Sequence, residues 1–269
     1  MLASLVDNRI QIGYGSTWHL LRSLGFHRDR FNAILTQATG ARNIAWLDFP
    51  AYVGSQTYPK EMPILEGEWR ALDFLGPFHP LRTAYESFWP KSGTPPNWDA
   101  VGEATFDAQR EWLLVEAKAH TGEISKTGTG ATKQSSIAMI RRAFESTRTA
   151  LNAAATVDDW LNGYYQYANR LATLYYLNHG GVPARLFFVY FCGDTYRNHD
   201  CPADESGWRA RLIEVRQSLG LSGNSEIEKR VHEVFVPVLF PDAGGKCIQP
   251  HSRAAKIDEL AANLPESWK

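Results

Sequence analysis

The feature that most constrains this chain is a pair of short apolar segments with the composition of buried β-strands. Residues 111–120 (EWLLVEAKAH) and 184–192 (ARLFFVYFC) are rich in aliphatic, β-branched and aromatic side chains. Both segments are far shorter than the roughly 20 apolar residues that span a bilayer. Segments with helical periodicity surround them, which predicts an α/β fold in which a mixed central sheet is flanked by helices.

Apolar periodicity and turn residues give the expected order of elements. Helices are expected at residues 16–24, 29–39, 68–75, 80–89, 135–155, 157–177, 208–219 and 254–264. Further strands are expected at 97–102 and 231–240, with 40–67 irregular and 103–110 a polar connection. No linker separates two folding units, so we expect a single domain, residues 1–269, whose first part (1–90) is a mostly helical elaboration.

The charge balance excludes a chain that is basic throughout. Lys and Arg number 28 and Asp and Glu number 29, a formal net charge of −1. A surface for nucleic acid must therefore come from local segregation of charge. Three cysteines (Cys192, Cys201 and Cys247) are too few and too scattered for a disulfide framework. Since the amino terminus also lacks the pattern of a secretory signal, a cytoplasmic location is expected.

Charged side chains occur where the strand at 111–120 ends. Strand alternation puts Glu116 and Lys118 on one face, after Trp112 and Leu114, and puts Leu113, Val115 and Ala117 on the other face. An unpaired buried charge is very unfavourable, so both side chains need a partner or a function. Asp99, on the preceding strand, can join Glu116 to hold a hard divalent cation such as Mg²⁺. Lys118 would orient or deprotonate the attacking water or neutralise charge at phosphorus, and a lowered pKa would help it.

Asp99 followed by Glu116-Ala117-Lys118 resembles the signature of the PD-(D/E)XK nuclease superfamily, in which a strand Asp precedes (D/E)-x-K on the next strand. Trp98 stands where the family has its name-giving Pro. The resemblance covers about residues 97–194 and implies a restriction-endonuclease-like fold with the order αβββαβ. It also implies Mg²⁺-dependent cleavage of phosphodiester bonds in DNA, with the two acidic residues as metal ligands.

The segment after the Lys strand carries a further resemblance. At helical spacing Gln166, Asn169, Arg170 and Thr173 form one polar stripe. In exonuclease-like branches of the superfamily a helix at this place supplies a Gln followed by a Tyr or a basic residue, and Gln166 and Arg170 resemble that element. Arg170 would suit a phosphate oxygen. The alternative is an amphipathic helix whose polar side faces water.

Local basic charge follows the motif. Between residues 126 and 148 a single acid, Glu145, accompanies five basic residues: Lys126, Lys133, Arg141, Arg142 and Arg148. Gly128 and Gly130 make the preceding loop adaptable enough for its backbone amides to approach phosphate. The alternative is a solvated helix face next to a surface loop.

Together these patterns predict a metal-dependent deoxyribonuclease. Its catalytic residues would be Asp99, Glu116, Lys118 and Gln166, with Asp99 and Glu116 binding Mg²⁺ and Mn²⁺ able to substitute. The nuclease-like core and a carboxyl-terminal extension would fill residues 91–269. DNA is the expected partner, no membrane partner is expected, and a homodimer stays open. The alternative from another class is a catalytically inactive nucleic-acid-binding or protein-interaction module on the same fold, with the charged residues as structural remnants. A third interpretation is a metal-dependent hydrolase of a smaller phosphate ester. For the motif itself, the alternative is a surface ion pair at a strand end.

Overall fold

The computed structural model of the chain describes residues 13–47, 69–91, 95–196 and 198–238. Contacts divide the chain into a unit of residues 1–236 and a second unit of residues 237–269. The description below concerns the first unit. The helix predicted at 254–264 and Cys247 lie outside the described residues.

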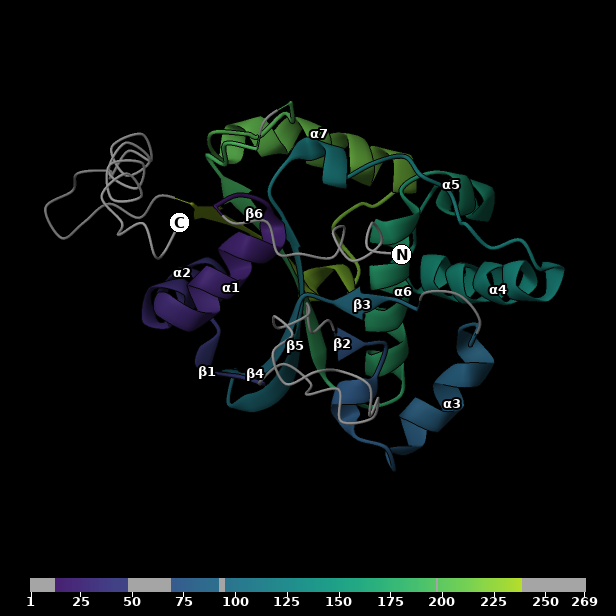
Figure 1. Cartoon of the computed structure of the whole chain (residues 1–269). Helices are drawn as coiled ribbons and strands as arrows, with labels where there is room; N and C mark the ends of the chain where they lie inside the picture. The colour runs from purple at the N-terminus through teal and green to yellow at the C-terminus, as the bar shows by residue number, and fades with distance from the viewer. Residues whose placement is uncertain (1–12, 48–68, 92–94, 197, 239–269) are drawn as a thin grey trace, which may run out of the picture. The chain divides into compact units, whose positions relative to one another are not determined.

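A five-stranded mixed sheet forms the centre of the fold (Figure 1). In spatial order its strands are β1 (Arg42–Trp46), β4 (Ala100–Phe106), β5 (Gln109–Lys118), β6 (Ala184–Cys192) and β7 (Val231–Pro237). The pairs β1–β4 and β4–β5 are antiparallel, whereas β5 and β6 are parallel. A second, two-stranded sheet pairs β2 (Trp69–Arg70) with β3 (Asn97–Trp98). The predicted α/β class with a mixed central sheet is therefore confirmed.

Helices lie on both sides of this sheet. The amino-terminal ones are α1 (Ser16–Phe26), α2 (Arg28–Thr39) and α3 (Pro80–Phe88). Those between β5 and β6 are α4 (Gln134–Leu151), α5 (Val157–Asn162) and α6 (Tyr165–His179), and α7 (Glu205–Leu219) follows β6. Short 3₁₀ turns are η2 (Asp73–Leu75), η3 (Thr121–Glu123) and η4 (Glu228–Arg230). Figure 1 shows α1 and α2 on one side of the strands and α4 and α6 on the other.

Strand alternation explains why β5 and β6 are apolar throughout most of their length. Leu114 and Phe188 belong to one large core together with side chains of α4, α6 and α7. Phe191, of opposite parity, contacts His19 of α1, with ring centroids 5.3 Å apart. Because both faces of these strands are covered, their sequences form continuous apolar runs rather than alternating ones.

The amino-terminal part is less helical than its sequence predicts. Residues 40–67 are expected to be irregular, yet β1 lies among them and forms the edge of the sheet. The helix predicted at 68–75 is wrong, because β2 and η2 occupy this segment. Trp69 pairs with Trp98, and the fully buried indole of Trp98 donates to the Ala71 carbonyl at 2.8 Å. This tertiary pairing overrides a weak local helical preference.

Two other boundaries differ from expectation. The connection predicted at 103–110 shrinks to Asp107 and Ala108, which both have positive φ and join β4 to β5 as a tight hairpin. The single helix predicted at 157–177 is two helices, α5 and α6, interrupted at Gly163, where an added Cβ would lie 2.5 Å from the Asp159 carbonyl oxygen. The interruption makes Tyr165 and Gln166 the first residues of a new helix.

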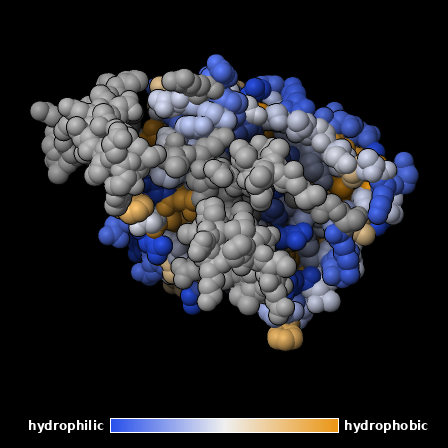
Figure 2. Space-filling view, viewed as in Figure 1, coloured by the Kyte–Doolittle hydropathy of each residue, from blue (hydrophilic) through white to orange (hydrophobic). Residues whose placement is uncertain are grey.

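The described surface is mostly polar. On the face seen in Figure 2, hydrophilic residues predominate and hydrophobic ones form small patches. The large hydrophobic side chains that are exposed, Phe26, Phe78 and Ile213, come from three separate parts of the fold. Among the helices that the structure describes, none has both the length and the apolarity needed to cross a bilayer. Cys192 and Cys201 are both free thiols.

A comparison of two glycines tests the packing of α7. Gly220 (φ 65°) follows α7, and a Cβ there would lie 2.2 Å from the backbone nitrogen of Ala155, whereas Gly181 (φ 79°) has open space around it. Gly181→Ala should lower the free energy of unfolding by only the strain of left-handed backbone, about 1–2 kcal/mol. Gly220→Ala adds a backbone clash, for a total of about 2–5 kcal/mol. Urea unfolding measures both, and equal losses would contradict this packing.

Candidate active site

Strand β5 ends in a buried network of charges. The Lys118 ammonium donates to Glu116 Oε1 at 2.5 Å, and Arg170 Nε of α6 donates to Glu116 Oε2 at 2.7 Å. The side chains of Glu116, Lys118 and Arg170 are 3%, 11% and 8% exposed, so three charges are held out of bulk water. Each oxygen of the Glu116 carboxylate therefore has a cationic partner.

The polar stripe of α6 faces the sheet. Asn169, Arg170 and Thr173 are buried, so the alternative in which this stripe faces water is wrong for these three residues. Asn169 Oδ1 accepts from Arg170 Nη1 at 2.8 Å, and the guanidinium carbon lies 5.2 Å from the centre of the Trp98 ring. These contacts orient the guanidinium toward Glu116.

Asp99 joins the site from the bend between β3 and β4. Its Oδ2 accepts the backbone N–H of Ala117 at 2.6 Å. In the antiparallel register of β4 and β5, the residue after Asp99 pairs with the residue before Glu116. The Asp99 carboxylate also contributes to the raised pKa of Lys118. The structure thus brings together the three residues that the sequence predicts at the centre of the site.

The charges of this network set the protonation states. Burial raises the pKa of Glu116, but Arg170 and Lys118 outweigh it, and the pKa lies below its ordinary value. Burial lowers the pKa of Lys118, but Glu116, Asp99 and Glu123 outweigh it, and this pKa lies above its ordinary value. This direction is opposite to the lowered pKa expected for a lysine beside a bound metal. Lys118 is an ammonium at neutral pH and supplies positive charge rather than accepting a proton.

Glu123 is a third carboxylate near the site, which the sequence analysis misses. Its Oε2 accepts the backbone N–H groups of Ala119 and His120 at 2.5 and 3.1 Å, and its Oε1 accepts the Ser16 hydroxyl at 2.7 Å. These bonds end the strand directly after Lys118. The signal available in the sequence is the spacing of a capping box, a polar residue followed three positions later by Glu.

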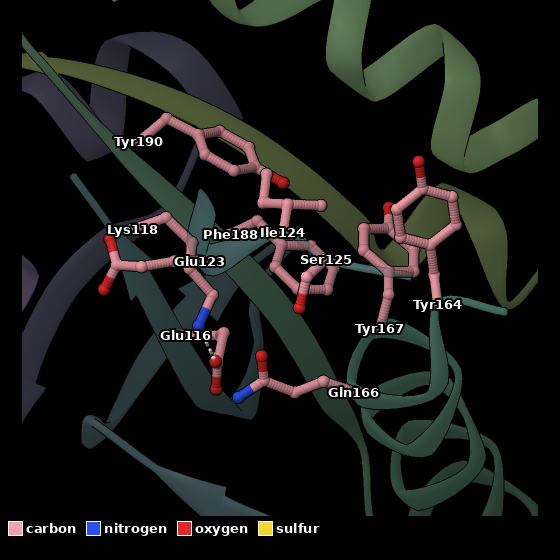
Figure 3. Close-up of a pocket in the computed structure, with 10 residues that line it drawn as sticks. All are labelled: Glu116, Lys118, Glu123, Ile124, Ser125, Tyr164, Gln166, Tyr167, Phe188 and Tyr190. Carbon is pink, nitrogen blue, oxygen red and sulfur yellow. Dashed lines mark hydrogen bonds and ion pairs between the residues drawn. The ribbon is translucent and has the colours of Figure 1, made fainter. Parts of the chain in front are cut away.

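A small pocket opens beside the ion pairs (Figure 3). Glu116, Lys118 and Gln166 line one side, and aromatic side chains that include Tyr167 and Tyr190 line the other. The pocket offers about 20 Å³ to a water-sized molecule, enough for one water or one ion. Gln166 is exposed, and Figure 3 shows its amide pointing toward the Glu116 carboxylate. Three of the four predicted catalytic residues, Glu116, Lys118 and Gln166, therefore line this pocket, and Asp99 does not.

Tyr190 is a further pocket residue that the sequence analysis does not single out. In the parallel register of β5 and β6 it pairs with Lys118. Its hydroxyl is buried and has no hydrogen-bond partner among the described residues. Burial holds its pKa well above the ordinary value, so the phenol stays neutral and remains a donor. An oxygen atom of a molecule bound in the pocket would be able to accept a hydrogen bond from this buried hydroxyl.

The local basic charge is mostly neutralised within the chain. Three of the five cations between residues 126 and 148 form ion pairs: Lys126–Glu214, Arg141–Asp158 and Arg148–Glu145. Lys133 and Arg142 are exposed and have no carboxylate partner in the described parts of the chain. The basic segment is therefore not a continuous patch, and two cations remain accessible to a ligand.

The carboxylates of the site are of the chemical type that a hard divalent cation prefers. Asp99, Glu116 and Glu123 act on one ammonium, that of Lys118, so the site already holds positive charge among oxygens. In the described residues no three His, Cys, Asp or Glu side chains are arranged to hold an ion. Asp99 and Glu116, the two carboxylates predicted as ligands, would suit Mg²⁺, which keeps several of its waters. Because both Glu116 oxygens contact cations, a metal on Oε1 would share that oxygen with the Lys118 ammonium or displace it.

Comparisons with known proteins identify no relative. A scan against protein-family models finds no match. Searches of curated proteins and of solved structures find none either. Inference about function therefore depends on the residues and the fold of this chain.

The Glu116–Arg170 pair makes the fold sensitive to acid. Because the folded-state pKa of Glu116 is lowered, its ionisation stabilises the fold above the unfolded-state pKa, about 4.3, and this contribution is lost as pH falls through the folded-state value. Arg170→Met should lower the free energy of unfolding at pH 7 by about 3–5 kcal/mol and weaken its dependence on acid pH. Urea unfolding at pH 7 and pH 4 measures both effects. Arg142→Met, at an exposed cation, is the matched control, and equal stability of the two variants would refute the buried pair.

A pair of tyrosines tests whether the Tyr190 hydroxyl lacks a partner in the protein. The Tyr85 hydroxyl is also buried but is hydrogen bonded to Thr173 at 3.0 Å. Tyr85→Phe should lower the free energy of unfolding by about 1 kcal/mol, whereas Tyr190→Phe should leave it unchanged or raise it by a similar amount. Thermal and urea unfolding measure the difference. A loss in Tyr190→Phe as large as in Tyr85→Phe would show that the hydroxyl is bonded.

Proposed function

We propose that this protein is a metal-dependent nuclease that hydrolyses phosphodiester bonds in DNA. Mg²⁺ is the proposed metal, and Mn²⁺ would replace it. The observation that carries the proposal is the convergence of Asp99, Glu116 and Lys118 at the end of β5, beside a pocket that Gln166 also lines. Two carboxylates, an ammonium and an amide are a set of groups suited to hydrolysis of a phosphate ester with the help of a metal.

The order of elements supports a restriction-endonuclease-like fold. Helix α2 leads into β1, the antiparallel strands β4 and β5 follow, and α4 to α6 connect β5 to the parallel strand β6. When β2, α3 and β3, which lie between β1 and β4 in the chain, are left out, this order is αβββαβ, with β1, β4, β5 and β6 adjacent in that order in the sheet. The proposed first strand, β1, lies outside residues 97–194, where the resemblance to the nuclease superfamily is found.

Each residue of the site has a proposed role. Asp99 and Glu116 would hold the metal, which lowers the pKa of a bound water and polarises a phosphoryl oxygen. Lys118, as an ammonium, stabilises the negative charge that grows on the phosphate in the transition state. The Gln166 amide, at the mouth of the pocket, hydrogen bonds a water or a phosphate oxygen and orients it. Arg170 holds Glu116 in place and is a positioning residue.

Substitutions that replace a charged side chain of the site by a neutral amide test the proposal. Asp99→Asn retains an oxygen that can accept the Ala117 N–H while removing the charge, and Lys118→Gln removes the ammonium. Each should slow cleavage of circular and linear DNA in Mg²⁺ or Mn²⁺ by about 10²-fold or more, and EDTA should stop cleavage by the native protein. These variants are preferable to Glu116→Ala, which would leave two buried cations without a counter-charge.

Glu145→Gln, at an exposed carboxylate of α4, is the control and should cleave like the native protein. Thermal unfolding checks that each variant is folded. Native rates in both Asp99→Asn and Lys118→Gln, or cleavage that persists in EDTA, would contradict the proposal. Single-stranded DNA and RNA in the same assay define the substrate.

A second candidate function is a catalytically inactive binding module on the same fold. The observation that favours it is the pairing of both Glu116 oxygens with Lys118 and Arg170, an arrangement that balances this carboxylate without a metal. Calorimetry with Mn²⁺ separates the two candidates. If the native protein gives heat of Mn²⁺ binding and Asp99→Asn gives none, the result supports the nuclease. If neither the native protein nor Asp99→Asn gives heat, the result supports the inactive module.

A further inference from the structure

A second and larger cavity lies outside the candidate active site. Its volume is about 520 Å³, within the range of pockets that bind small organic ligands. It lies among the end of α3, the loop at 129–133 and the first turns of α4 and α6. None of the four predicted catalytic residues lines it.

Aromatic side chains form part of the cavity wall. Trp89 and Tyr165 both line it, with ring centroids 6.4 Å apart and ring planes inclined by 38°. Phe144 packs edge-on against Tyr165 at 5.6 Å and holds that ring in place. Tyr165 directly precedes Gln166, so neighbouring residues at the start of α6 line the cavity and the active-site pocket respectively.

Positive charge and hydroxyl groups form another part of the wall. Lys133 lines the cavity, is exposed, and has no carboxylate partner in the described residues. The hydroxyl residues Thr129 and Thr132 line it as well. Helix α4 begins after Lys133 with neither a side-chain cap nor an acidic residue in its own first turn.

We propose that this cavity binds one nucleotide of a single-stranded nucleic acid. The base would stack on the ring of Tyr165, which Trp89, itself 4% exposed, supports from the protein side, and the phosphate would contact Lys133 and the first amides of α4. Stacking on aromatic rings accepts any base, and a lysine beside backbone amides suits a phosphate. The inference rests on the proposed function in one respect, since it adds a binding site for a substrate strand next to the proposed catalytic pocket.

Binding of a single strand in EDTA tests the inference without cleavage. The probe is a fluorescein-labelled oligothymidylate, and its anisotropy gives the affinity. Lys133→Gln should weaken binding about 10-fold and reduce the slope of log affinity against log salt by roughly 0.7. Tyr165→Leu should weaken binding by about 10-fold with the slope unchanged. Arg142→Gln, at an exposed unpaired cation of α4 that does not line the cavity, should keep the native affinity.

Inorganic polyphosphate, which competes with the labelled strand and has no bases, separates stacking from charge. Its affinity should fall in Lys133→Gln and stay native in Tyr165→Leu. Native affinity for the strand in Lys133→Gln, an exposed position whose change leaves the fold intact, would overturn the inference. An equal loss in Arg142→Gln, or an equal loss of both probes in Tyr165→Leu, would overturn it as well.

Failure of this inference and failure of the proposed function can be told apart. Asp99→Asn should bind the strand in EDTA with native affinity, because Asp99 does not line the cavity. If the protein binds single strands through Lys133 but does not cleave them, the cavity site is supported and the nuclease assignment is wrong. If the protein cleaves DNA while Lys133→Gln binds strands with native affinity, the nuclease assignment is supported and the cavity site is wrong.

Discussion

Burial of the Glu116 carboxylate at the end of β5 is the constraint on which the rest of the structure depends. A buried carboxylate without partners is unfavourable by several kcal/mol. Lys118, from the same strand, and Arg170, from α6, remove most of this cost by pairing with its two oxygens. Arg170 is held in turn by Asn169 and by the ring of Trp98. These contacts tie α6 to the end of β5 and to the indole of Trp98.

The charges that stabilise this end of the sheet are the same ones that the proposed chemistry would use. In the structure, Lys118 stands as the cation among the Asp99, Glu116 and Glu123 carboxylates. Under the proposed function, a divalent cation on Glu116 would compete with this ammonium, so metal binding and release of Lys118 would be coupled. An ammonium released from Glu116 would then be available to act on the proposed substrate.

The break between α5 and α6 places consecutive residues at two different pockets. Gly163 ends one helix, and the next begins with Tyr165 and Gln166, whose side chains line different pockets. The start of α6 thus puts the amide of Gln166 at one pocket and the ring of Tyr165 at the other.

Local patterns in the sequence determined the two buried strands and the face that Glu116 and Lys118 share, because strand alternation has a period of two residues and needs no partner to define it. They failed at 68–75, where pairing of Trp69 with Trp98 replaced the helix. Only the tertiary structure decided that Arg170 reaches Glu116 across 54 residues, that Glu123 closes the strand and that Tyr190 lies beside Lys118. These contacts depend on strand register and helix rotation, which the whole core sets and no local segment encodes.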